Sequence, residues 1–254
     1  MQQACPPRRS SGPPGHGPSG LDAPVEESFS TRPNARQLRS TLRPRGAPVL
    51  AIALVVFGAA VPSVRHGALR RVGGLLVVSD PIVPGDVVAI SESGGPGEFQ
   101  AAEIEAADLV QRRQFSRVML LRADDMDRMS DELARRGVRL EDPVLATLRQ
   151  LGVPESAIVT VDAGEGGTTE STRALATWVH AHPSRVLVVI GAAHSRRYRR
   201  ALLRVWPPDT PKPHVTYPQR TFFRPTDWWT SRRSVREGVF ELEKLAWDYV
   251  VHPW

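Results

Sequence analysis

Residues 185–194 read Arg-Val-Leu-Val-Val-Ile-Gly-Ala-Ala-His, and this stretch decides the fold. Its unbroken aliphatic run from 186 to 190 is typical of a strand that is buried on both faces of a parallel sheet. A glycine turn then leads to His194 and into a helix that we expect to begin near Ser195. A buried strand followed by a tight turn and a helix is the repeating unit of α/β proteins.

The same pattern of strand, turn and helix recurs along the chain. We expect further strands at 86–91, 118–121 and 157–161. We expect helices at 98–113, at 126–151 with a break at Asp142-Pro143, after a cap at Thr168 or Thr169, and at 234–251. Apolar strands that alternate with amphipathic helices predict an α/β fold for residues 85–254, a Rossmann-like, mostly parallel sheet with helices on both faces.

The N-terminal 45 residues differ in composition from the rest of the chain. They are rich in Pro, Gly, Ser and Arg and carry +4 of the formal net charge of +6. Because they have few large apolar groups to offset the entropy of ordering, we expect residues 1–45 to be a disordered cytoplasmic tail. The remaining +2 argues against a nucleic-acid partner, since such binding depends on clustered cations.

Residues 46–64 contain no ionisable side chain. As a helix they would rise about 28 Å, close to the thickness of a membrane's hydrocarbon core. We therefore expect a transmembrane helix at 46–64 and a connector at 65–84, with a cleaved signal segment as the alternative. Five arginines lie at 32–45 and three at 65–71. This excess before the span predicts a single-pass protein of the cytoplasmic membrane with its main domain on the outer side.

Three loops that follow expected strands should meet at one edge of the sheet, because ligands bind beyond the carboxyl ends of parallel strands. The first loop contains Gly94 and Gly95, which allow close approach of the backbone to a ligand but lack the dinucleotide-binding spacing. The second loop places Thr168-Thr169-Glu170-Ser171 at a helix N-terminus. Hydroxyl and N–H groups there can hold an oxyanion, or they can simply cap the helix.

The third loop ends at His194, and the helix after it begins with a crowd of cations: Arg196, Arg197, Arg199 and Arg200. Cations at a helix N-terminus oppose the helix dipole, and an anionic ligand would offset that cost. A solvated arginine face and a structural histidine are the alternatives. The acidic run Asp124-Asp125-Met-Asp127 has no partner histidine or regular spacing, so we expect no metal site. The sequence does not identify a cofactor.

Several motifs occur in an order that resembles the ElyC/SanA/YdcF family of bacterial envelope proteins. They are Gly152-Val-Pro154, Gly167-Thr-Thr-Glu-Ser171, Val186–Arg197, Trp228-Trp229 and Glu241-x-x-Lys244-Leu245. The resemblance covers roughly residues 74–249 and implies a Rossmann-like fold, often behind a membrane anchor. It also implies a link to cell-envelope or peptidoglycan precursor metabolism.

The positions that match the family imply a ligand site composed of Gly94, Gly95, Thr168, Glu170, Ser171, His194 and Arg197. The chain departs from the family pattern in its first helix. Where the family commonly has an arginine, this chain has Glu103 and Glu105. This difference predicts an altered ligand site.

Two functions fit these residues. The first is an envelope-biogenesis enzyme, a hydrolase or transferase, that acts on a phosphate-bearing cell-wall precursor linked to a lipid or a nucleotide. His194 would be its general acid or base, Arg197 would pair with the phosphate, and Thr168 would hold the phosphate oxygens. The second is a noncatalytic membrane-anchored module that binds an envelope metabolite or a partner protein. The absence of a recognisable nucleophile and base pair motivates the second function, but the convergence of polar groups at one edge of the sheet favours the enzyme.

Overall fold

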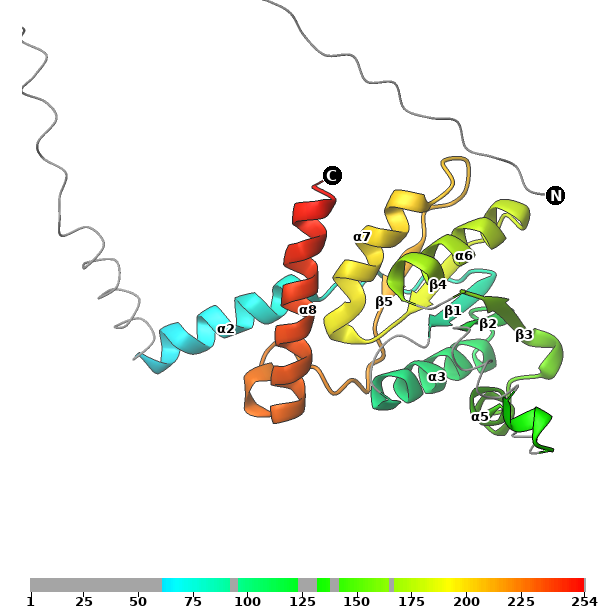
Figure 1. Ribbon diagram of the computed structural model, residues 1–254, viewed down its shortest axis with the longest axis horizontal. Coiled ribbons are helices and arrows are strands. Elements are labelled where there is room, and N and C mark those ends of the chain that lie inside the picture. The colour runs from blue at the N-terminus through cyan, green and yellow to red at the C-terminus, as the bar shows by residue number, and fades with distance from the viewer. Residues whose placement is uncertain (1–60, 92–95, 123–131, 138–141, 165–166, 254) are drawn as a thin grey trace, which may run out of the picture. The chain divides into compact units, whose positions relative to one another are not determined.

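The computed structural model describes residues 61–253 except for 92–95, 123–131, 138–141 and 165–166 (Figure 1). Its strands form one parallel sheet in the order β3-β2-β1-β4-β5. The strands are β1 Val87–Ser91, β2 Arg117–Arg122, β3 Ile158–Asp162, β4 Val186–Val189 and β5 His214–Thr216. The α-helices are α2 Pro62–Leu76, α3 Pro96–Gln111, α5 Pro143–Gln150, α6 Thr168–Ala181, α7 Ser195–Val205 and α8 Arg232–Val251. Short 3₁₀ turns lie at η1 Glu155–Ala157, η2 Ala192–His194 and η3 Trp228–Thr230.

Helices cover both faces of the sheet (Figure 1). Successive strand residues point to opposite faces, so Val88 and Ile90 of β1 pack with α3 and α5, while Val87 and Ala89 pack with α6 and α7. The order of the strands is that of doubly wound nucleotide-binding sheets, in which the crevice beyond the carboxyl ends of the strands is the usual ligand site. The described chain therefore has the α/β architecture that alternating apolar strands imply.

The structure corrects the expectation of a transmembrane helix. No helix of the described residues is long and apolar enough to cross a membrane. Most of the expected span, residues 46–60, lies outside the described residues, as does the expected disordered tail. The predicted location of the main domain outside the cytoplasmic membrane stays a prediction.

The end of the expected span and the first part of the expected connector form α2 instead. This helix carries three arginines at 65–71 and buries only one side of its last turns, where Leu76 belongs to a third apolar cluster together with Phe223 and Trp228. The Trp228 indole donates a hydrogen bond of 2.8 Å to the Leu69 carbonyl. Residues 62–64 are thus the first residues of a helix that packs on the α/β domain. The arginines that follow them limit the apolar surface of this helix to a stripe.

Two further expectations differ from the structure. Neither Thr168 nor Thr169 caps α6, because the N-cap position belongs to Gly167, whose φ of 91° suits glycine. The strand β5 is absent from the sequence prediction, since three residues between prolines at 213 and 218 are too short for an alternating pattern. By contrast, α5 begins at the expected break, where Asp142 accepts hydrogen bonds from the N–H groups of Val144 and Leu145.

Candidate functional site

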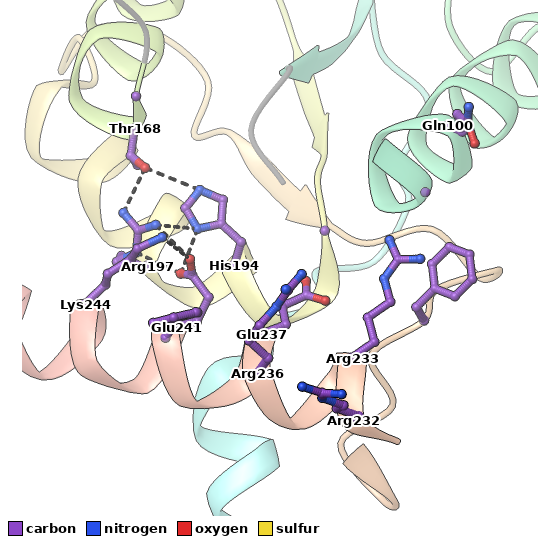
Figure 2. A pocket seen from close by; sticks show the side chains of 15 residues that line it. Gln100, Thr168, His194, Arg197, Arg232, Arg233, Arg236, Glu237, Glu241 and Lys244 are labelled. Carbon is purple, nitrogen blue, oxygen red and sulfur yellow. Dashed lines mark hydrogen bonds and ion pairs between the residues drawn. The ribbon is translucent and has the colours of Figure 1, made fainter. Parts of the chain in front are cut away.

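The carboxyl ends of the strands open into a pocket of about 1270 Å³ (Figure 2). Segments that follow β1, β3 and β4 contribute Gly97, Thr168 and His194 to its lining. The opposite side is one face of α8, which presents two rows of residues at a spacing of four. The rows are Arg232, Arg236, Phe240 and Lys244, and Arg233, Glu237 and Glu241. A spacing of four places side chains on one helix face, so α8 is a major part of this pocket.

A partly buried polar network joins α6, α7 and α8 at one end of the pocket (Figure 2). The Glu241 carboxylate lies 3.0 Å from His194 Nδ1, and His194 Nε2 lies 3.3 Å from the Thr168 hydroxyl. Glu241 also accepts two hydrogen bonds from Arg197, from Nε at 2.9 Å and from Nη2 at 3.1 Å. Arg197 Nη1 donates to the Thr168 hydroxyl at 2.8 Å.

Burial and charge set the protonation of this network. Burial lowers the pKa of His194 despite the opposing effect of Glu241, and Arg197 and Lys244 lower it further. Burial alone would raise the pKa of Glu241, but hydrogen bonds from His194 and Arg197, together with the charge of Arg197, outweigh burial and hold that pKa well below its usual range. At neutral pH the network therefore contains a neutral imidazole beside an ionised carboxylate.

The protein itself occupies most of the hydrogen-bonding capacity of Arg197. A guanidinium has five N–H groups. Those of Arg197 donate to both Glu241 oxygens and to the Thr168 hydroxyl. Arg197 is therefore better placed to position Thr168 and Glu241 than to hold a ligand with a bidentate pair.

The free cations of the pocket lie on α8. Among the described residues, five cationic and two acidic side chains line the pocket, which gives this part of the lining a formal charge of +3. Within the part of the chain that the structure describes, Arg232 and Arg236 have no hydrogen bond or ion pair and are exposed. The Arg233 guanidinium lies over the Phe222 ring, 4.2 Å from its centre. These side chains present a positive surface to an anionic ligand.

Glu237 differs from the other acid of the pocket. It is partly buried, and among the described residues it has no hydrogen bond or ion pair. Burial and the nearby charge of Glu98 raise the pKa of Glu237 to about 7, although Arg233 opposes this shift. A carboxyl group with that pKa exchanges its proton under physiological conditions.

The structure brings together three of the residues that the sequence singles out, namely Thr168, His194 and Arg197. Gly94 and Gly95 lie outside the described residues. Thr169 lines a second hollow, between α6 and the C-terminal half of α8. Glu170 and Ser171 do not line the pocket; the buried Ser171 hydroxyl donates to the Thr168 carbonyl.

The other arginines of α7 contact protein groups. Arg196 donates to the carbonyls of residues 74 and 77, and Arg199 pairs with Asp80. Arg200 pairs with Asp248. These arginines neither form a free solvated face nor reach the pocket, so they tie α7 to neighbouring elements.

Sequence reasoning missed the contribution of α8, although a signal was present. Residues 232–244 repeat charged or aromatic residues at intervals of four, which marks one helix face. The sequence does not indicate that this helix face packs at the edge of the sheet. The acidic run at 124–127, weighed as a metal site, lies outside the described residues.

Comparison with known proteins adds no relative: no protein-family model and no curated protein matches the chain. The resemblance to the ElyC/SanA/YdcF family stays a prediction.

Proposed function

We propose that the chain is an enzyme, a hydrolase or transferase, that acts on a phosphate-bearing substrate bound in this pocket. The observation that carries the proposal is the chain of contacts from Glu241 through His194 to Thr168 at the edge of a cationic pocket. An acid that orients a histidine, which in turn contacts a hydroxyl, is the arrangement by which enzymes activate a nucleophile.

The cations of α8 would bind the phosphate. A guanidinium matches a phosphate with two parallel hydrogen bonds, and Arg232 and Arg236 have such groups free on the pocket side of α8. The sequence predicts that Arg197 binds the phosphate, whereas we propose that the arginines of α8 bind it.

The catalytic step follows from the protonation of the network. With Nδ1–H donating to Glu241, the Nε2 lone pair of the neutral His194 faces the Thr168 hydroxyl. A charge-assisted bond to the carboxylate favours this tautomer. Thr168 Oγ attacks phosphorus as its proton passes to Nε2, the bond to the leaving group breaks, and His194 returns the proton to the leaving oxygen. Water or an acceptor hydroxyl then attacks the phosphorus and gives its proton to Nε2, and His194 passes this proton to Thr168 Oγ as the bond between Oγ and phosphorus breaks. Arg197 Nη1 stabilises the charge that develops on Thr168 Oγ.

The proposed substrate class comes from the resemblance and from the charge of the pocket. A lipid- or nucleotide-linked cell-wall precursor is the substrate class that the resemblance implies, and the positive pocket is compatible with either phosphate source. We retain an envelope precursor as part of the proposal.

Turnover of phosphate esters by the full chain tests the proposal. The panel contains p-nitrophenyl phosphate, nucleotide sugars, sugar phosphates and polyprenyl phosphates. We expect His194→Ala and Thr168→Val to lower turnover by about 100-fold or more, because each removes one member of the proton-transfer pair. His180→Ala, which removes an exposed histidine of α6, is the matched control. Wild-type turnover in a folded Thr168→Val variant would exclude the nucleophile.

One observation favours a second candidate, a noncatalytic binding module. The groups of the network satisfy one another, and Arg197 and Glu241 neutralise each other, as in a structural link between helices. Anion binding to the wild-type chain without turnover of any ester in the panel would support this second function.

A further inference from the structure

Glu237 occupies the part of the pocket where an anion is otherwise attracted. It lies on α8 one turn before Glu241, in the same row of side chains (Figure 2). Glu241 is bound by His194, Arg197 and Lys244, whereas Glu237 has no hydrogen bond or ion pair among the described residues. Two carboxyl groups on one helix face thus have opposite surroundings, an arrangement that separates acid from base at functional sites.

The charged groups around Glu237 come from several elements. On α8 they are Arg233, Arg236 and Glu241, on α3 the neighbour is Glu98, and on the α7 side the pocket contains the neutral His194. Glu98 is fully buried and accepts hydrogen bonds from the Thr221 hydroxyl and from the N–H groups of residues 222 and 223. The hydrogen bonds of Glu98 are with the segment after β5. Its charge therefore repels an ionised Glu237, and the two carboxyl groups share no hydrogen bond.

An ionised Glu237 conflicts with an anionic ligand. A phosphate or sulfate held by the arginines at 232, 233 and 236 would face a second negative charge in the same pocket. Protonation removes that repulsion and turns the carboxyl group into an O–H donor for an anionic oxygen. We propose that Glu237 binds the anionic ligand in its protonated form, so that the pocket takes up a proton together with the anion. This inference rests on the anion site of the proposed function and adds the proton to it.

The sign of the pH effect follows from linkage. A group that is protonated in the complex and partly ionised in the free protein makes binding stronger as pH falls. Since the pKa of Glu237 is about 7, affinity should be constant at acidic pH and should fall by up to about tenfold per pH unit above pH 7. Proton uptake should rise over the same range toward one proton per anion.

Calorimetric titration of the full chain with sodium sulfate tests this inference. Sulfate keeps one charge state between about pH 5.5 and pH 9, so any pH dependence belongs to the protein, and buffers of different ionisation enthalpy measure the protons taken up. Pyrophosphate is the second probe. We expect Glu237→Gln, which keeps a hydrogen-bond donor and removes the titration, to bind sulfate with an affinity that does not change above pH 7. Its affinity at pH 8.5 should exceed that of the wild-type chain by up to about thirtyfold.

A matched control separates this effect from general charge. Glu243→Gln removes the same charge from an exposed residue of α8 outside this pocket, and we expect it to keep the wild-type pH dependence. Should Glu237→Gln fail to fold, Glu237→Asp retains the carboxyl group and should retain the proton uptake.

The outcomes distinguish this inference from the proposed function. Sulfate binding without proton uptake in the wild-type chain, or unchanged pH dependence in Glu237→Gln, overturns the role of Glu237 and leaves the anion site standing. Failure of the wild-type chain to bind either probe at any pH overturns the anion site itself. The turnover assay of His194 and Thr168 variants is independent of both results.

Discussion

The network around Glu241 predicts a specific loss of stability in Glu241→Gln. The substitution keeps the shape of the side chain and removes the charge that faces Arg197, whose side chain is only 16% exposed. Breaking a buried ion pair by neutralising one partner typically costs 3–5 kcal/mol. Lys244 is 56% exposed and loses little, so we expect a decrease of about 3 kcal/mol in the free energy of unfolding at pH 7.

The pH dependence of this difference provides a second test. The pKa of Glu241 is lowered in the folded chain, so its stabilisation is present above the ordinary glutamate pKa of about 4.3 and is lost as pH falls toward the folded value. Urea unfolding followed by tryptophan fluorescence should show a constant difference between wild type and variant above about pH 5 and a narrowing difference below about pH 4. Glu243→Gln, an exposed change on the same helix, should stay within about 0.5 kcal/mol. If Glu241→Gln costs no more than this control, the network does not hold α8 in place.

Two further predictions concern the supports of the pocket. A Cβ at Gly73 would lie 2.6 Å from the Pro225 carbonyl oxygen, so Gly73→Ala should destabilise the chain by about 2 kcal/mol in urea unfolding. Gly74→Ala meets no atom within 4 Å and should stabilise the helix by about 0.5–1 kcal/mol; equal effects of the two changes would refute the packing of α2. Glu98→Ala leaves the N–H groups of Phe222 and Phe223 without their carboxylate acceptor and should cost about 3 kcal/mol, measured against Glu243→Ala. A loss below about 1 kcal/mol would mean that water replaces the carboxylate.

The sequence was sufficient for the central part of the sheet and for half of the candidate site. The apolar strands β1, β2 and β4 are buried on both faces and were visible as short aliphatic runs. The rule that ligand sites lie beyond the carboxyl ends of strands then placed Thr168 and His194 at one edge. In both cases the information is local or follows from one general property of parallel sheets.

The remaining features depend on tertiary packing that no local pattern encodes. For the residues of α2 the sequence predicts the end of a membrane span and a connector. Their packing against Trp228 depends on a residue more than 150 positions away, so no local pattern indicates it. The roles of the arginines on α7 were also undetermined. Arg197 enters the pocket, while Arg200 and Arg204 bind Asp248 at a different position along α8. The position of an arginine along α7 does not determine its role. The role depends on where the tertiary fold places the acidic residues of α8.

The position of α8 therefore connects stability with function. Its Glu241 forms the network that aligns His194 with Thr168, and its Arg232 and Arg236 form the positive side of the pocket. The same helix follows η3, whose Trp228 is held by the Leu69 carbonyl of α2. A change that loosens α2 should thus weaken anion binding as well as stability, even though no residue of α2 lines the pocket. The pocket depends on α2 in this way because the cations that define it lie on a helix whose start is fixed by that contact.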